Sequence, residues 1–210
     1  AAKSGEELVK EQAFVFPDRS GELIALRPEL TPTLARMVAA RQNELTFPLR
    51  WWSFGPFWRY ERPQKGRSRE FFQWNIDLIG ALGPEADAEL VAIGATFLKQ
   101  TGLKSDEVTI LVNNRRLMEK ALLDIAIPLE LHKSVFRLID RRDKLSPEAW
   151  ESYALELGLT SEQFMNLVGL LGNTSLWEQS EELRRFFAAL EVMGVREYVR
   201  YDPQIIRRLD

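Results

Sequence analysis

The fold is decided by residues 57–80, which read FWRYERPQKGRSREFFQWNIDLIG. Side chains of an extended strand alternate between the two faces of a sheet. In the second half of this stretch, one face is apolar and suits a core: Phe72, Trp74, Ile76 and Leu78. The opposite face is polar: Gln73, Asn75 and Asp77. A polar row opposite a buried face is able to hydrogen-bond a small ligand, and a carboxylate in that row would attract a cationic one.

The first part of the stretch, residues 57–61, predicts a strand that pairs with the one just described. Together they form an antiparallel hairpin. The pairing that we expect places Arg59 over the polar face, with Gln73 and Asp77. The planar guanidinium group would bind a phosphate there. The alternative is a solvated sheet face, on which Arg59 pairs with Glu61 or Asp77.

The tip of the hairpin is a loop of eight residues, 62–69, and four of them are positively charged: Arg62, Lys65, Arg67 and Arg69. The loop is longer than a bare hairpin needs. Such a cluster would contact nucleotide phosphates or an RNA backbone. The alternative is a solubilising loop that has no partner.

Four tryptophans lie close to these cations in the sequence: Trp51, Trp52, Trp58 and Trp74. They suit base stacking, but aromatic residues at strand spacing are more often part of a core. We therefore expect these tryptophans to be core residues. His132 lies in an expected helical run and should be a packing or surface residue.

The rest of the chain alternates irregularly between strands and helices. Strands are expected at residues 13–16, 22–27, 49–54, 108–113 and 197–201, and helices at 4–12, from Thr31 onward, at 83–102 and through most of 115–193. Thr31 should cap its helix, with Pro32 at the first helical position. The identifiable strand pairs are joined by hairpins. We therefore expect an α+β fold, in which helices flank an antiparallel sheet.

The composition describes an ordinary globular chain of 210 residues, 45% hydrophobic and 28% charged. The absence of cysteine excludes disulfides and thiolate metal sites, and a single histidine excludes a histidine-rich metal site. The net charge of −3 means that any nucleic-acid contact must come from a local basic patch. We expect a cytoplasmic protein with no membrane span, and the chain reads like a piece of something longer.

Three ordered motifs resemble those of one family, and the resemblance covers nearly all of the chain. Residues 57–73 closely resemble the second class-defining motif of class II aminoacyl-tRNA synthetases, in its histidyl version. Residues 26–32 look like the histidyl loop that meets the amino group of the substrate, and residues 206–210 resemble the start of the histidine-specific signature. Residues 112–115 and the helical insertion also follow the histidyl layout.

The resemblance implies roles for individual residues. ATP would be bound by Arg59, Glu61 and Arg67, with Arg59 and Arg207 as the two catalytic arginines on its α-phosphate. Histidine would be bound by Glu29, Thr31, Gln73 and Asp77, with Asp77 positioned for the imidazole. The tRNA acceptor end would be contacted by Arg62, Lys65, Arg67 and Arg69. In two places the chain departs from the family: Asp77 stands where many bacterial members have Glu, and Arg208 stands where the family usually has Gly.

The resemblance also implies an activity and a domain layout. It implies a ligase that uses ATP and Mg²⁺ to activate histidine and transfer it to tRNA, without a protein-held metal site. Residues 1–127 would be part of a class II-like catalytic core, residues 128–192 a helical insertion, and residues 193–210 a return to the core. The complete protein would form a homodimer. This chain would be inactive alone, because the dimer-forming first motif, the final ATP-binding motif and the anticodon-binding domain are expected outside it.

Two alternatives remain open at this stage. One is a non-catalytic paralogue, the regulatory subunit of ATP phosphoribosyltransferase in histidine biosynthesis, which shares the fold but binds a partner enzyme. Arg59, Gln73, the basic loop and Arg207 favour the synthetase over this paralogue. The other is an RNA-binding module that uses the basic hairpin and its tryptophans, and it leaves the polar row without a purpose.

Overall fold

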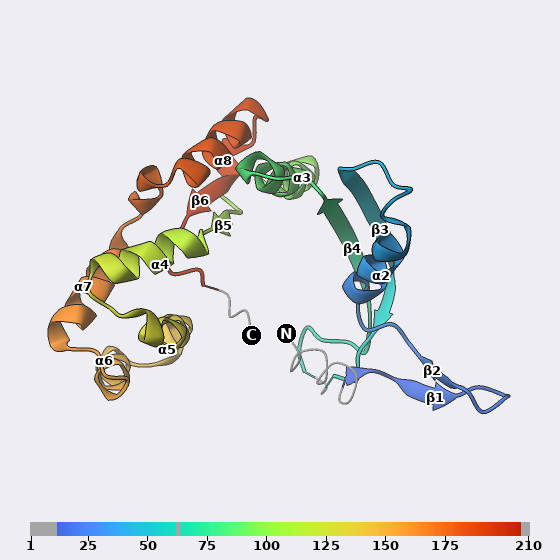
Figure 1. Ribbon diagram of the computed structural model, residues 1–210, viewed down its shortest axis with the longest axis horizontal. Coiled ribbons are helices and arrows are strands. Elements are labelled where there is room, and N and C mark those ends of the chain that lie inside the picture. The colour runs from blue at the N-terminus through green and yellow to red at the C-terminus, as the bar shows by residue number, and fades with distance from the viewer. Residues whose placement is uncertain (1–11, 62–63, 207–210) are drawn as a thin grey trace. The chain divides into compact units, whose positions relative to one another are not determined.

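The computed structural model describes residues 12–61 and 64–206 (Figure 1). The chain divides into two compact units, and the boundary in the sequence lies between residues 81 and 82. The described residues up to 81 are called the hairpin unit below, and those from 82 onward the helical unit. The expected helix at 4–12 lies almost entirely outside the described residues, as do Arg62 and Arg207. We expected a domain boundary at 127/128, and that assignment stays a prediction.

The hairpin unit begins with two short antiparallel strands, β1 (Val15–Pro17) and β2 (Leu23–Ala25). Both are shorter than expected. The turn between them is organised by Asp18, whose Oδ1 accepts hydrogen bonds from the backbone N–H groups of Ser20 and Glu22 at 2.8 and 2.9 Å. The side-chain hydrogen bond from Ser20 and these N–H groups stabilise the charged form, so the pKa of Asp18 lies below its usual value.

The predicted basic-tipped hairpin is confirmed. Strand β3 (Leu49–Trp58) pairs antiparallel with β4 (Glu70–Ile79), from Leu49 opposite Ile79 to Trp58 opposite Glu70. Two strands were expected in place of β3, one ending at residue 54 and one beginning at 57. The structure instead continues one strand through Gly55 and Pro56.

Helix α2 (Thr31–Arg41) follows β2 and begins where the sequence predicted. The prediction that Thr31 caps this helix is wrong. Leu30 occupies the N-cap position without a side-chain cap, and Thr31 and Pro32 lie in the first turn. Because the Thr31 hydroxyl does not cap the helix, it is available to other groups.

The apolar face of the β3–β4 hairpin is not a core in this structure. Its aromatic residues remain largely exposed: Trp52 by 70%, Phe54 by 64%, Phe72 by 60% and Trp74 by 45%. The expectation that the tryptophans are core residues is therefore wrong for Trp51, Trp52 and Trp74. Trp51, on the opposite face, is 36% exposed, and Trp58 is partly buried, with its indole N–H donated to Glu70 at 2.9 Å. Strand alternation identified an apolar face, but it did not show whether another layer covers that face.

The helical unit contains nearly all of the buried hydrophobic residues. Its elements are α3 (Pro84–Gln100), β5 (Ile110–Val112), α4 (Arg115–Asp124), α5 (Leu129–Asp140), α6 (Pro147–Glu156), α7 (Ser161–Gly172), α8 (Glu181–Val192) and β6 (Val199–Tyr201), with short 3₁₀ turns at Arg142–Lys144, Leu176–Gln179 and Arg196–Tyr198. The helix predicted at 83–102 and the helical run predicted after residue 115 are confirmed. None of the helices in the described part of the chain has both the length and the apolar character of a membrane span.

Strands β5 and β6 pair in parallel, with Ile110 opposite Val199 and Val112 opposite Tyr201. The sequence predicted these two strands but no pairing between them. A hairpin connection requires antiparallel strands, whereas these two strands are joined through helices α4 to α8 and can run in the same direction.

Helices α3 and α8 pack against each other along a row of small residues. Ala88, Ala92 and Ala95 of α3 recur at helical spacing and are buried in the core cluster that also contains Leu190 of α8. Small side chains on one face let the two helix backbones approach closely. At the start of α3, Glu85 accepts two hydrogen bonds from Arg185 of α8, at 2.8 and 2.9 Å.

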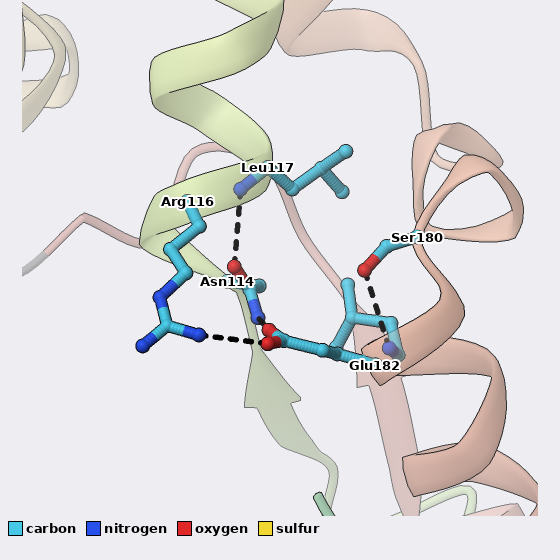
Figure 2. A network of polar contacts seen from close by, with 6 residues as sticks. Asn114, Arg116, Leu117, Ser180 and Glu182 are labelled. Carbon is cyan, nitrogen blue, oxygen red and sulfur yellow. Dashed lines mark hydrogen bonds and ion pairs between the residues drawn. The ribbon is translucent and has the colours of Figure 1, made fainter.

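A polar network joins the start of α4 to the start of α8 (Figure 2). The side-chain oxygen of Asn114 accepts a hydrogen bond from Leu117 N–H at 3.0 Å and caps α4, while its Nδ2 donates to Glu182 at 2.8 Å. Arg116 donates to the other Glu182 oxygen at 2.8 Å, and Ser180 caps α8 (Figure 2). Two helix starts that are distant in sequence are thus fixed to one another by a single carboxylate.

His132 is 4% exposed and lies in α5 within the helical unit. Its Nε2 is 3.1 Å from the carbonyl oxygen of Ile127, and its ring packs edge-on against Phe136. Of the two interpretations of His132, packing residue or surface residue, the structure supports the first.

Candidate functional site

The site is built on the polar face of the β3–β4 hairpin. Residues directly opposite in an antiparallel pair point to the same face. Because Trp51 lies opposite Asp77 and Gly55 lies opposite Gln73, Asp77 and Gln73 belong to the same face as these β3 residues. The alternation of β3 then continues this face to Arg59, just beyond the end of the strand.

Arg59 lies over this face, as predicted. Its guanidinium carbon is 5.1 Å from the ring centroid of Phe71, a residue of the polar face. Its Nε donates a hydrogen bond of 2.9 Å to the carbonyl oxygen of Pro28. The backbone N–H of Arg59 donates to Arg69 O at 3.0 Å and extends the hairpin pairing by one step. The hydrogen bond to Pro28 and the contact with the Phe71 ring fix the orientation of the Arg59 guanidinium group. Its terminal nitrogens, Nη1 and Nη2, are further donors that suit an anion.

A polar hollow of about 500 Å³ lies at the tip end of the hairpin. Its described lining residues are Gln12, Arg59, Glu61, Gly66, Arg67, Ser68 and Phe71. The three residues predicted to bind ATP, Arg59, Glu61 and Arg67, are therefore brought together. Within the hollow, Glu61 accepts a hydrogen bond of 2.6 Å from Arg67 Nη1, which holds the basic tip in a defined conformation. Two arginines in one polar hollow suit a phosphate-bearing ligand.

The basic tip itself is a tight turn. Gln64 and Arg67 form an isolated antiparallel bridge, with Arg67 N–H donating to Gln64 O at 3.0 Å. Gly66 between them has φ of 80°, a conformation that residues with a Cβ rarely adopt. Lys65 and Arg69 are exposed, and Arg69 stacks over Tyr60 at 4.4 Å. Both cations are accessible to an anionic partner.

A second hollow, of about 520 Å³, lies at the other end of the hairpin. Its lining residues are Thr31, Leu34, Ala35, Val38, Ala39 and Gln42 of α2 and its end, with Phe47, Asp77 and Ile79. The walls are mostly apolar, and Asp77 supplies the one acidic group among these lining residues. An apolar hollow with one carboxylate suits a small ligand that combines a flat or aliphatic body with a positive charge. Two of the four residues predicted to bind histidine, Thr31 and Asp77, line it.

The other two predicted histidine-binding residues are not among the lining residues of either hollow. Gln73 lies between them on the polar face, opposite Gly55. Glu29 is partly buried and directly follows Pro28, the residue whose carbonyl oxygen holds Arg59. The structure thus places both beside the site, without a contact that assigns either of them a role.

Sequence reasoning missed Arg27. Its guanidinium carbon is 4.6 Å from the ring centroid of Phe57, and its Nε donates to Pro56 O at 2.9 Å. The sequence carried one signal of this contact, a glycine at position 55 between two predicted strands, and once the strand is known to continue through Gly55, such a glycine often marks a close approach by another group. Among residues 12–61 and 64–206, no group of three or more His, Cys, Asp or Glu side chains is arranged to hold a metal ion.

Comparison with known proteins agrees with these motifs. The family model for histidyl-tRNA synthetase matches residues 1–208. A histidine–tRNA ligase of Haloarcula marismortui is 36% identical over 222 residues, which cover 99% of this chain and 51% of that protein. A chloroplastic/mitochondrial histidine–tRNA ligase of Arabidopsis thaliana is 33% identical over 217 residues, which cover 99% of this chain and 44% of that protein. The chain therefore spans about half the length of these relatives.

Solved structures show the same fold. A histidyl-tRNA synthetase from a Nostoc species superimposes with a TM-score of 0.76 at 20% identity, over 94% of this chain and 49% of that one. An ATP phosphoribosyltransferase regulatory subunit/histidyl-tRNA synthetase from Bacillus halodurans gives a TM-score of 0.73 at 24% identity, over 94% of this chain and 54% of that one. The mixed helix-and-sheet fold is that of an incomplete class II aminoacyl-tRNA synthetase domain. With the family model matched along nearly its whole length, the chain belongs to the histidyl-tRNA synthetase family.

Proposed function

We propose that the complete protein containing this chain activates histidine with ATP and transfers it to tRNA. The observation that carries the proposal is the pair of hollows on one face of the β3–β4 hairpin. One is polar and contains Arg59 and Arg67. The other is apolar and contains Asp77. The first suits a nucleotide phosphate and the second a small cationic amino acid, so the two reactants would meet over the same sheet face.

The proposed reaction is an in-line displacement at the α-phosphorus of ATP. The carboxylate of histidine attacks and pyrophosphate leaves. A hydroxyl group of the terminal ribose of tRNA then attacks the carbonyl carbon of the adenylate, and AMP leaves. Catalysis of this kind depends on positioning and on charge stabilisation rather than on a nucleophilic side chain. Arg59 would stabilise the negative charge on the α-phosphate. Arg207, the proposed second arginine, lies outside the described residues.

The other proposed substrate-binding residues divide in the same way, between ATP at the polar hollow and histidine at the apolar hollow of the β3–β4 hairpin. Glu61 and Arg67 would hold ATP, and Mg²⁺ would accompany its phosphates. Asp77 would bind the imidazole and Gln73 the body of the amino acid, while Glu29 and Thr31 would accept hydrogen bonds from the ammonium group. Thr31 suits this role because its hydroxyl does not cap α2.

Lys65 and Arg69, with Arg62 and Arg67, would meet the acceptor end of the tRNA. The complete protein would act as a homodimer, and this chain alone would be inactive, because about half of the relatives' length lies outside it. The cytoplasmic location stays a prediction.

The test is histidine-dependent ATP–pyrophosphate exchange by the complete protein. We expect exchange, and we expect Asp77→Asn to raise the KM for histidine by about 10- to 100-fold, because a lost charge contact to a ligand costs about 1.5–3 kcal/mol. Asp87→Asn, which changes an exposed carboxylate of the helical unit, is the matched control and should leave KM unchanged. A complete protein that shows no histidine-dependent exchange would overturn the proposal.

A second candidate function is supported by the Bacillus halodurans neighbour, whose name includes a regulatory subunit of ATP phosphoribosyltransferase. A regulatory subunit would bind its catalytic partner and would not exchange pyrophosphate. The arginines of the polar hollow favour the synthetase, because binding a partner enzyme does not require them. Co-elution with an ATP phosphoribosyltransferase catalytic subunit, together with absent pyrophosphate exchange, would favour the second candidate.

RNA binding with a steep salt dependence and no requirement for ATP or histidine would indicate the RNA-binding module instead.

A further inference from the structure

The Arg27 side chain lies directly against the backbone of β3. A Cβ added to Gly55 would be 2.5 Å from Nη2 of Arg27, which is closer than two heavy atoms can pack. The guanidinium group therefore occupies the space that any other residue at position 55 would need. The ring beneath the guanidinium group belongs to Phe57, which is 1% exposed and so is packed on its other sides as well.

Three hydrogen bonds join the Arg27–Pro28 segment to the end of β3. Trp58 N–H donates to Arg27 O at 3.1 Å, Arg27 Nε donates to Pro56 O at 2.9 Å, and Arg59 Nε donates to Pro28 O at 2.9 Å. Only the first is a backbone–backbone bond. Pro28 has no N–H, so this segment cannot add a further backbone donor at that residue. The Arg27 side chain supplies the donor instead.

We propose that Arg27 is a positioning residue, which holds the Pro28 carbonyl group in the place where it fixes the guanidinium of Arg59. The proposal rests on the proposed function, in which Arg59 contacts the α-phosphate. Arg27 acts through the backbone. Its Nε–H donates to Pro56 O and its guanidinium group lies over the Phe57 ring, and these contacts hold the backbone of residue 27 against β3. The carbonyl oxygen of the following residue, Pro28, accepts the hydrogen bond from Arg59 Nε–H.

Arginine suits this position better than lysine. The planar guanidinium can stack on Phe57 and donate from its edge to Pro56 O at the same time. The ammonium group of a lysine is not planar, so it cannot lie close to Gly55 and cover the Phe57 ring as the guanidinium group does. We therefore expect that Arg27→Lys does not restore what Arg27→Gln removes.

The experiment uses the complete protein and measures histidine-dependent pyrophosphate exchange. For Arg27→Gln we expect kcat to fall about tenfold, with the KM values for ATP and histidine changed by less than about threefold, because a small misplacement of a catalytic group reduces the rate more than the binding. Gly55→Ala should lower kcat in the same direction, because the new methyl group displaces the tip of Arg27. Its matched control is Gly169→Ala in α7, where an added Cβ meets nothing within 4 Å.

The double variants separate positioning from general damage. If Gly55→Ala acts by displacing Arg27, the Arg27→Gln/Gly55→Ala protein should be no slower than Arg27→Gln alone. If Arg27 acts through Arg59, Arg27→Gln should have no further effect on kcat in an Arg59→Gln background. Additive losses in either pair would overturn the proposal, as would an unchanged kcat in Arg27→Gln. Arg19→Gln, an exposed arginine in the β1–β2 turn, controls for the loss of a positive charge in this unit.

A readout that does not depend on catalysis distinguishes this inference from the proposed function. In NMR spectra of the complete protein, the Nε–H of Arg59 should exchange with water faster in Arg27→Gln than in the wild type, because its bond to Pro28 O is loosened. Equal exchange rates would contradict the positioning role even if the enzyme is active. A wild-type protein without histidine-dependent pyrophosphate exchange would refute the proposed function. The rate of hydrogen exchange at the Arg59 Nε–H would still decide whether Arg27 is a positioning residue.

Discussion

The hairpin unit and the helical unit bury their residues in very different ways. In the described part of the hairpin unit the buried hydrophobic residues are Val38, Leu49 and Phe57, whereas the helical unit contains one continuous buried cluster that draws on all of its α-helices. The proposed substrate-binding residues all lie in the hairpin unit, apart from Arg62 and Arg207, which are not among the described residues. The comparison shows that the candidate site is held by hydrogen bonds and stacked cations, while the folding energy of the chain comes mainly from the helical unit.

The largest expected effect is on catalysis, from Arg59→Gln. We expect exchange to fall by about 100- to 1000-fold, because a lost donor to transition-state charge costs about 3–4 kcal/mol. The free energy of unfolding should fall by only about 1 kcal/mol, because the substitution removes one hydrogen bond and one cation–π contact but no core side chain. Pyrophosphate exchange and urea unfolding of the complete protein measure the two quantities. A large loss of stability would break the division between the two units.

The next effect is on stability, from Leu167→Ala in α7. Leu167 is fully buried, so its truncation should lower the free energy of unfolding by about 3 kcal/mol. Met165→Ala changes a residue of the same helix that is 64% exposed, and it should change stability by less than about 0.5 kcal/mol. Urea unfolding of both variants makes the comparison. Similar values for the two would mean that α7 does not pack as described.

A smaller effect on stability is expected from Asn114→Ala. The substitution removes the cap of α4 and the hydrogen bond to Glu182, and a lost N-cap costs about 1 kcal/mol. Asn166→Ala, at an exposed position inside α7, is the matched control and should be neutral or slightly stabilising. Thermal unfolding is the measurement. If the two asparagine variants had the same Tm, the network in Figure 2 would make no net contribution.

The smallest effect is a pH dependence at the same network. The hydrogen bond from Asn114 and the charge of Arg116 hold the pKa of Glu182 below its usual value of 4.5. A carboxyl group with a lowered folded-state pKa contributes stability above pH 4.5, which is lost as the pH falls through the folded pKa. Glu182→Gln should therefore flatten the decline of Tm in acid, whereas Glu162→Gln, at an exposed site in α7, should not. A steeper decline in Glu182→Gln would contradict the sign.

Local patterns predicted much of this fold. The hairpin, the start of α2, helix α3 and the helical run after residue 115 could be predicted because strand alternation, Pro at a helix start and helical periodicity are properties of neighbouring residues. The parallel pairing of β5 with β6 could not, because the two strands are separated by most of the helical unit. The exposure of Trp52 and Phe72 could not be predicted either, since alternation identifies a face but not the layer that covers it.

The candidate site was predicted to a similar extent. The face shared by Arg59, Gln73 and Asp77 follows from alternation and register, and the structure has that arrangement. The Arg27 contact does not follow, because it depends on how closely a segment that is distant in sequence approaches Gly55. A glycine within a strand signals such an approach, but it does not identify the group that makes it.

The parallel β5–β6 pair has a consequence for how this chain can vary. The chain leaves β5 after Val112 and enters β6 at Val199, which lies opposite Ile110, so the connection has to cross from one end of the strand pair to the other. Helices α4 to α8 make this crossover, and all of them contribute side chains to the core cluster. A change in the length of one of these helices would therefore disturb the core, so the loops between the helices are where we expect relatives to differ in size.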